Sequence, residues 1–267
     1  LQGLIAHDRG QWFDRIRQEM TFSAPSEELA STLFDAYICL GEYVIHGPTP
    51  RTEVRRLFGN VVRTAERTNA RPALGWARAL IGETRYLDGN ISGARSSPEA
   101  ALEVYRAVGS TTGEAYALQS LGQIAIAEGN RDLADARARQ ALTLARWSPM
   151  SHHLLPRIFG TLIDAAVDAE SGAARAREAE ETLDEPEACA SCEVFGSVPL
   201  AIAFARVGAL NPARRHLDVA ERSGRRWVGD SRPAAVTEAR AWVTAASSRL
   251  RRRPTSPSIR CRPSATR

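Results

Sequence analysis

The stretch AYALQSLGQIAIAEGNRDLADARARQALTLAR, residues 115–146, decides the fold class of this chain. Its first half places apolar side chains on one face of a helix, with the small Gly122 beside them: Leu118, Leu121 and Ala125. Gly129 and Asn130 then supply a turn, because glycine readily adopts the left-handed conformation that follows a helix. The second half carries an alanine stripe at spacings of four, three and four residues: Ala134, Ala138, Ala141 and Ala145. The stretch therefore predicts a helical hairpin.

A small residue within an apolar helical run recurs along the 267-residue chain at intervals of 38 to 41 residues: Gly41, Gly82, Gly122, Gly160 and Ala201. Such a period indicates a repeat architecture. The hairpin resembles a tetratricopeptide (TPR) unit in its Leu-Gly helix, its turn and its alanine-lined second helix, although the standard TPR period is about 34 residues. No alternating run of β-branched residues suggests a sheet. The chain is therefore predicted to be an all-α, TPR-like helical-hairpin solenoid with about five hairpins plus a closing helix.

The predicted organisation has three parts: residues 1–22 as a partial helical repeat, 23–249 as the TPR-like α-solenoid, and 250–267 as a disordered tail rich in Arg, Pro and Ser. The closing helix is expected from Pro233 to about Arg249. Pro98 and Pro212 each follow a residue that can cap a helix, so each is expected at the first position of a helix.

All 35 basic residues are arginine, and they are unevenly placed. Residues 249–267 hold seven arginines and no acid, which leaves the rest of the chain mildly acidic. Because a nucleic-acid-binding domain normally carries a basic stripe on a folded face, nucleic acid is not an expected partner of the folded body. No apolar run has the length of a membrane span, and the first residues do not form a signal peptide, so no membrane partner and a cytoplasmic location are expected.

Several segments resemble one family in their order along the chain: LFDAYICLGEYVIHGP, LARWSP followed by HLLPRIFGT, and EACASCEVFGSVPLAIAFARVGALNPARRHLDVAERS. The family is the C-terminal TPR-like region of large actinobacterial transcriptional regulators, which also carry an ATP-binding domain and a DNA-binding domain of the LuxR or SARP kind. The resemblance implies a signalling or regulatory segment of such a regulator, with a protein, a peptide or another part of the parent chain as its partner. Because the chain has no lysine, it contains no P-loop of the Walker type.

In a TPR-like array the first helix of each hairpin lines the concave side. Positions on one face of these helices are expected to form a partner-binding groove: Asp35, Glu42, Trp76, Glu83, Tyr116, Gln119, Gln123, Arg157 and Phe195. Acids, aromatics, amides and an arginine in one groove suit an extended peptide or a partner helix. The alternative is that the aromatic members simply pack between hairpins.

Cys189 and Cys192 form the one C-x-x-C spacing in the sequence. Two ordinary thiols are the first interpretation, and a redox-sensitive pair or half of a metal site are the alternatives. The adjacent His152 and His153 point in different directions on a helix, so no metal site is predicted from them. With no recognisable nucleophile and base pair, the chain is predicted to be a non-catalytic scaffold without a cofactor. The alternative is a ligand or redox sensor that uses the groove or this cysteine pair.

Overall fold

The computed structural model describes residues 41–42, 44–148, 150–183, 192–227 and 231–251. Within these ranges every regular element is a helix, which confirms the all-α class. A first helix ends at His46, and ten more follow: α4 Arg51–Thr68, α5 Arg71–Leu87, α6 Ile91–Val108, α7 Thr111–Ala127, α8 Arg131–Ala145, α9 Ser151–Asp164, α10 Ala169–Leu183, α11 Glu193–Arg206, α12 Leu210–Gly224 and α13 Ser231–Arg251. The predicted partial repeat at 1–22 and all of the predicted tail beyond residue 251 lie outside the described residues.

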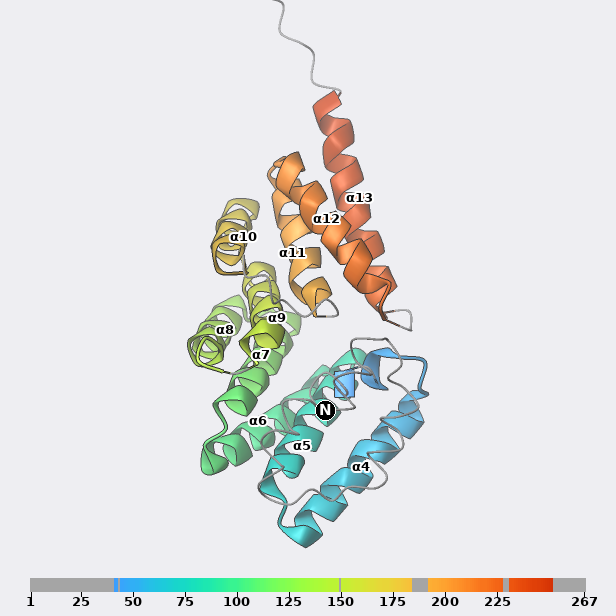
Figure 1. The fold of residues 1–267 in the computed structure, drawn as a ribbon, viewed down its shortest axis with the longest axis vertical. Coiled ribbons are helices and arrows are strands. Elements are labelled where there is room, and N and C mark those ends of the chain that lie inside the picture. Colours follow the sequence, from blue (N-terminus) through green and yellow to red (C-terminus); the bar gives the residue numbers. More distant parts are fainter. Residues whose placement is uncertain (1–40, 43, 149, 184–191, 228–230, 252–267) are drawn as a thin grey trace, which may run out of the picture.

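The helices pack in chain order, each against the next (Figure 1). In addition, α5 contacts α7, α7 contacts α9, and α9 contacts α11, so alternate helices form a row of their own. The last helix, α13, packs against both α11 and α12 through an apolar stripe: Val236, Ala239, Val243 and Ala246. The predicted closing helix is thus present and begins at Ser231. None of the helices described has both the length and the apolar character needed to cross a lipid bilayer.

The predicted hairpin turn between α7 and α8 is present. Gly129 adopts a left-handed conformation with φ of 80°, and Asn130 caps α8 by accepting a hydrogen bond from the Leu133 backbone N–H at 3.1 Å. A side-chain oxygen caps α6 and α7 in the same way, from Asn90 and Ser110. These local signals set the helix boundaries.

The expected positions of two prolines were wrong. Pro98 lies inside α6 because this helix already begins at Ile91, and Pro212 lies in the first turn of α12, which begins at Leu210. A proline cannot donate a hydrogen bond to the carbonyl four residues earlier. In α6 this carbonyl belongs to Ala94, and it faces Gly82 of α5. A Cβ added to Gly82 would lie 3.1 Å from the Ala94 carbonyl oxygen. The glycine therefore allows α5 to approach the interrupted part of α6.

The same arrangement recurs between α9 and α11. Pro199 leaves the Phe195 carbonyl without its helical donor, and this oxygen lies 2.3 Å from the position that a Cβ on Gly160 would occupy. Between α7 and α9, a Cβ on Gly122 would meet Thr161 Cγ2 at 3.1 Å. The periodic small residues of the sequence are therefore points of close helix packing.

Candidate functional site

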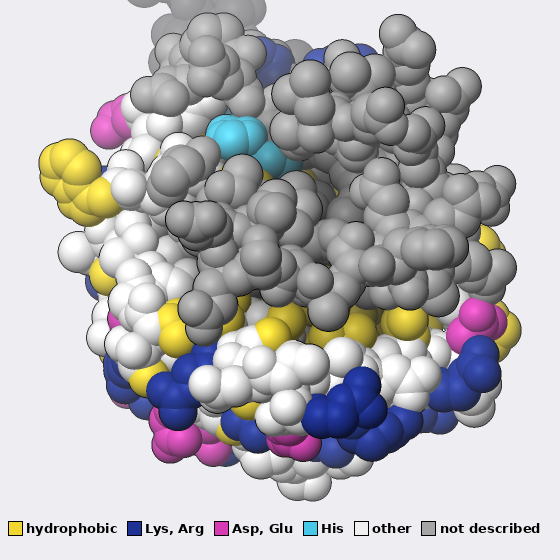
Figure 2. All heavy atoms as spheres, turned by 60° about the horizontal axis from the view of Figure 1, so that its bottom comes forward, with side chains coloured by type: hydrophobic (Ala, Val, Ile, Leu, Met, Phe, Trp, Pro, Cys, Tyr) yellow, Lys and Arg dark blue, Asp and Glu magenta, His cyan; other side chains and the backbone are white. Residues whose placement is uncertain are grey.

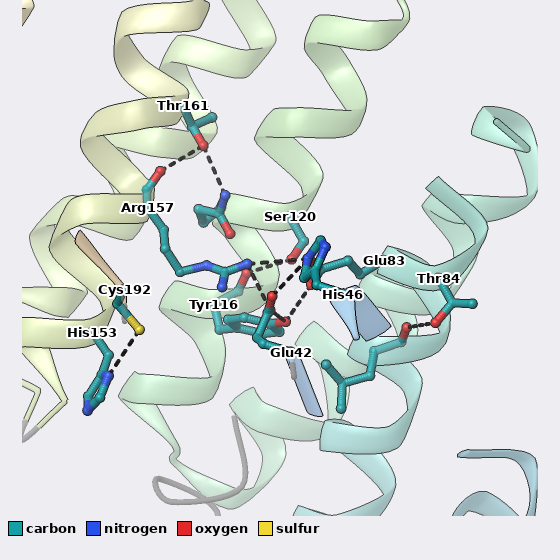
Figure 3. A network of polar contacts seen from close by, with 12 residues as sticks. Glu42, His46, Glu83, Thr84, Tyr116, Ser120, His153, Arg157, Thr161 and Cys192 are labelled. Carbon is teal, nitrogen blue, oxygen red and sulfur yellow. Dashed lines mark hydrogen bonds and ion pairs between the residues drawn. The ribbon is translucent and has the colours of Figure 1, made fainter. Parts of the chain in front are cut away.

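A cluster of charged side chains lies inside the protein, where the row formed by α5, α7, α9 and α11 meets the first described helix (Figure 3). Glu42 comes from the helix that ends at His46, Glu83 from α5, Tyr116 from α7 and Arg157 from α9. These four residues lie on the helix faces predicted for the groove, and the packing of alternate helices brings them together. We call Glu42, His46, Glu83, Tyr116, Arg157 and Arg232 the buried charge cluster.

Two carboxylates share one tyrosine and one arginine. The Tyr116 hydroxyl lies 2.6 Å from Glu42 Oε1 and 2.8 Å from Glu83 Oε2, and it donates its single proton between them. Arg157 Nη2 lies 2.8 Å from Glu42 Oε1 and 3.5 Å from Glu83 Oε1. Glu42 and Arg157 are only 1% and 3% exposed, a depth at which a charge is stable only when it is paired.

His46 connects this pair to the last helix. Its Nε2 lies 3.1 Å from Glu83 Oε1 and 2.7 Å from Nη2 of Arg232, which belongs to α13. The same Nε2 also lies 3.2 Å from Glu42 Oε2, so the ring is held between two carboxylates and a guanidinium. The cluster therefore joins residues that are 186 positions apart in sequence.

Aromatic rings cover the two arginines. The guanidinium carbons of Arg157 and Arg232 lie 4.0 and 3.8 Å from the centroid of the Phe195 ring. The Trp227 ring is nearly perpendicular to the rings of Phe195 and His46, and its centroid lies 5.6 and 5.9 Å from their centroids. Such cation–π contacts stabilise a guanidinium that has lost its water.

The charges shift one another's pKa values. Burial by itself raises the pKa of Glu42, but Arg157 and the hydrogen bond with His46 outweigh burial and hold this pKa well below its usual value. Burial, reinforced by the two carboxylates, raises the pKa of Tyr116 well above that of a free tyrosine. Burial lowers the pKa of Arg232 to about 10, so this side chain is still a cation at neutral pH. At neutral pH Glu42 is therefore ionised, Tyr116 keeps its proton and Arg232 is a cation.

One oxygen or nitrogen from each of Glu42, His46 and Glu83 lies within 4.8 Å of the other two, a spacing that would suit a divalent cation. The two arginines already occupy this position, since Arg157 contacts Glu42 and Arg232 contacts His46. A divalent cation would have to enter between two positive charges. The arrangement fits an ion-pair network rather than a metal centre.

The predicted groove positions converge, but they do not form an open groove. Six of the nine are buried in or beside the charge cluster: Glu42, Glu83, Tyr116, Gln119, Arg157 and Phe195. Gln119 donates a 2.9 Å hydrogen bond to Thr161, and Gln123 is partly exposed. Trp76 is buried against Phe58 of α4, with ring centroids 5.5 Å apart, and Asp35 lies outside the described residues. Arg157, which was expected to face this groove, is buried instead, because the alternate helices pack too closely to leave its side chain in solvent.

Sequence analysis missed three members of this region. His46 follows Glu42 by four residues, so the helical spacing could have identified it. Arg232 and Trp227 lie outside the repeat period, and no signal in the sequence connects them with Glu42.

Cys192 precedes α11 and is buried, with its Sγ 3.3 Å from Nδ1 of His153. Cys189 lies outside the described residues, so neither the interpretation as two ordinary thiols nor the redox-pair alternative is tested. Neither a protein-family model nor a curated protein sequence gives a significant match to the chain.

Glu42 gives the cluster a defined pH dependence. Folding lowers its pKa below the unfolded value of about 4.3, so its contribution to stability is complete above that pH and is lost as the pH falls through the folded pKa. We expect the difference in the free energy of unfolding between the wild type and Glu42→Gln, measured with urea, to be steady from about pH 7 to 5 and to shrink below about pH 4. Glu42→Gln should be less stable at neutral pH and should lose less stability on acidification. The same change at the exposed Glu99 is the control, and an acid slope equal to that of the wild type in Glu42→Gln would contradict the assignment.

Proposed function

We propose that the chain is a non-catalytic interaction scaffold, a TPR-like solenoid whose alternate helices form the binding wall. The observation that supports this most is the row formed by α5, α7, α9 and α11, each in contact with the next. In TPR-like arrays the first helices of successive hairpins form such a row. The buried charge cluster ties this row to the first and last described helices.

The shifted pKa values support binding rather than acid–base chemistry. A general acid or base works best with a pKa near the working pH. In the cluster the pKa of Glu42 moves down and that of Tyr116 moves up, so both move away from neutrality. These side chains keep fixed charges and hydrogen bonds, which suits a rigid support.

The partner that suits such a wall is an extended peptide or a helix of another protein or domain. A wall that is already rigid in the free protein loses little conformational entropy on binding. The resemblance to the TPR-like region of actinobacterial transcriptional regulators supports a signalling role within such a regulator. We therefore propose the regulatory segment of a multidomain transcriptional regulator as the biological setting.

Site-specific photo-crosslinking tests the wall. A benzoylphenylalanine is placed at Gln123, the partly exposed wall position on α7, and in a second variant at Thr143, which is exposed on α8. Both proteins are incubated with peptides that the wild-type protein selects from a random library. We expect a cross-link at position 123 and little at position 143. Selected peptides that cross-link equally at both positions, or mainly at 143, would contradict binding on the wall.

A further inference from the structure

Three arginines form a straight row on the outer face of α4. Arg56, Arg63 and Arg67 are separated by seven and four residues, and these spacings return to the same side of a helix with 3.6 residues per turn. All three are exposed. At a rise of about 1.5 Å per residue the row is about 16 Å long. We call these three residues the arginine stripe.

The arginines of the stripe have no acidic partner among the described residues. Other arginines of this region are paired: Arg55 with Asp88 at 2.6 Å, and Arg78 with Glu66 at 3.3 Å. In the stripe, Arg63 donates to the Asn60 side chain, which lies on the same face. Figure 2, which looks onto the end of the molecule that contains α4, shows arginine side chains gathered in its lower half, with some acidic side chains among them. A local basic surface is therefore present although the chain without its last residues is mildly acidic.

We propose that the arginine stripe binds the phosphate backbone of a nucleic acid duplex. Phosphates are contacted mainly by Arg and Lys and by small polar side chains such as Thr and Asn. The exposed neighbours on the same side of α4 are of this kind, Thr52 and Asn60, whereas the exposed Glu66 lies beside the stripe and pairs with Arg78. Duplex DNA carries one charge for about every 1.7 Å of its axis, so a row of about 16 Å faces several phosphates.

Two other polyanions fit the stripe less well. An anionic membrane usually binds a helix that also inserts apolar side chains, whereas the apolar residues Val54 and Phe58 of α4 are fully buried. An acidic protein surface is usually held by aromatic or aliphatic anchors beside the charges. Beside the stripe, α4 exposes polar and charged side chains, and none of its exposed residues is aromatic or aliphatic. Its chemistry is therefore that of sequence-independent contact with phosphates.

The test compares two triple variants of the full chain. The stripe variant is Arg56→Gln, Arg63→Gln and Arg67→Gln. The control variant is Arg146→Gln, Arg177→Gln and Arg222→Gln, three exposed arginines elsewhere that form no ion pair with any residue in the described part of the chain. Both variants lose the same charge and keep the basic C-terminal residues, so their difference reports on the stripe alone. Thermal melting followed by circular dichroism should give both the stability of the wild type, because exposed substitutions are nearly neutral.

Binding to a 20-base-pair duplex of random sequence is measured by fluorescence anisotropy between 50 and 200 mM NaCl. Three lost phosphate contacts should reduce the slope of log K, where K is the association constant, against log salt concentration by about 2.7. The fourfold rise in salt should therefore weaken binding by the wild type about 40-fold more than binding by the stripe variant. The control variant should keep the wild-type slope. Equal slopes in all three proteins, equal losses in both variants, or no duplex binding by the wild type would overturn the proposal. Poly-glutamate binding that depends on the stripe, without duplex binding, would instead assign it to an acidic protein.

Discussion

Arg157→Met is expected to lower the free energy of unfolding by about 3–5 kcal/mol, the usual cost of removing one partner from a buried ion pair. The change leaves the carboxylates of Glu42 and Glu83 in the interior without the guanidinium that lies 2.8 Å from the first of them. It also removes the contact of Arg157 with the Phe195 ring. Methionine has a similar length, so the loss comes from charge and hydrogen bonds more than from a cavity.

The measurement is urea unfolding of Arg157→Met, Glu42→Gln and the double variant. Because each single change leaves the other charge less compensated, the double variant should be more stable than the sum of the two losses predicts. Arg139→Met is the matched control, since Arg139 pairs with Asp135 at 2.9 Å on the surface and should cost only about 0–1 kcal/mol. Losses of similar size in Arg157→Met and Arg139→Met, or strict additivity in the double variant, would show that the cluster is not held by this pair.

Gly160→Ala is expected to cost about 3 kcal/mol, near the upper end for one extra carbon in a packed interior. The new Cβ would lie 2.3 Å from the Phe195 carbonyl oxygen, which is backbone and cannot rotate away. Helices α9 and α11 would therefore have to move apart. Because Phe195 also covers Arg157 and Arg232, this movement would disturb the charge cluster as well.

Gly172→Ala is expected to stabilise the same protein, in contrast to Gly160→Ala. Gly172 lies inside α10, and an added Cβ would meet only the Ala166 Cβ at 3.6 Å, an ordinary contact. Alanine is preferred over glycine within a helix, so this variant should gain about 0.5–1 kcal/mol. Thermal unfolding of both variants measures the contrast. A Gly160→Ala variant as stable as the wild type would show that α9 and α11 do not require this close approach.

The sequence was informative where the cause is local. The alanine stripe and the Gly129–Asn130 turn correctly predicted the α7–α8 hairpin, because helix periodicity and turn conformation depend on neighbouring residues. The recurring small residues also identified the helix face that carries Glu42, Glu83, Tyr116 and Arg157, four of the six members of the charge cluster, but not His46 or Arg232. The position of Pro98 was not predicted correctly, because α6 already begins at Ile91 with Asn90 as its cap, and the carbonyl that Pro98 leaves without a helical donor faces Gly82 on a different helix.

The net charge of the chain did not predict the arginine stripe. Composition reports the sum of all charges, whereas the stripe exists because seven- and four-residue spacings place three arginines on one side of α4 while its apolar side faces the core. The spacing was present in the sequence. Its exposure, and the pairing of the neighbouring arginines with acids of other segments, depended on the packing of α4.

Sequence by itself thus determined the helices, their turns and the residues that share a face. Only the tertiary structure decided that most of the shared face is buried while Gln123 stays partly exposed, because burial depends on how near alternate helices approach. It also brought Arg232 of α13 to His46, a contact that the recurring spacing in the sequence does not predict. The physical reason is the range of the interactions. Helix periodicity and turn conformation depend on residues a few positions apart, whereas ion pairs and packing form between any segments that the fold places side by side.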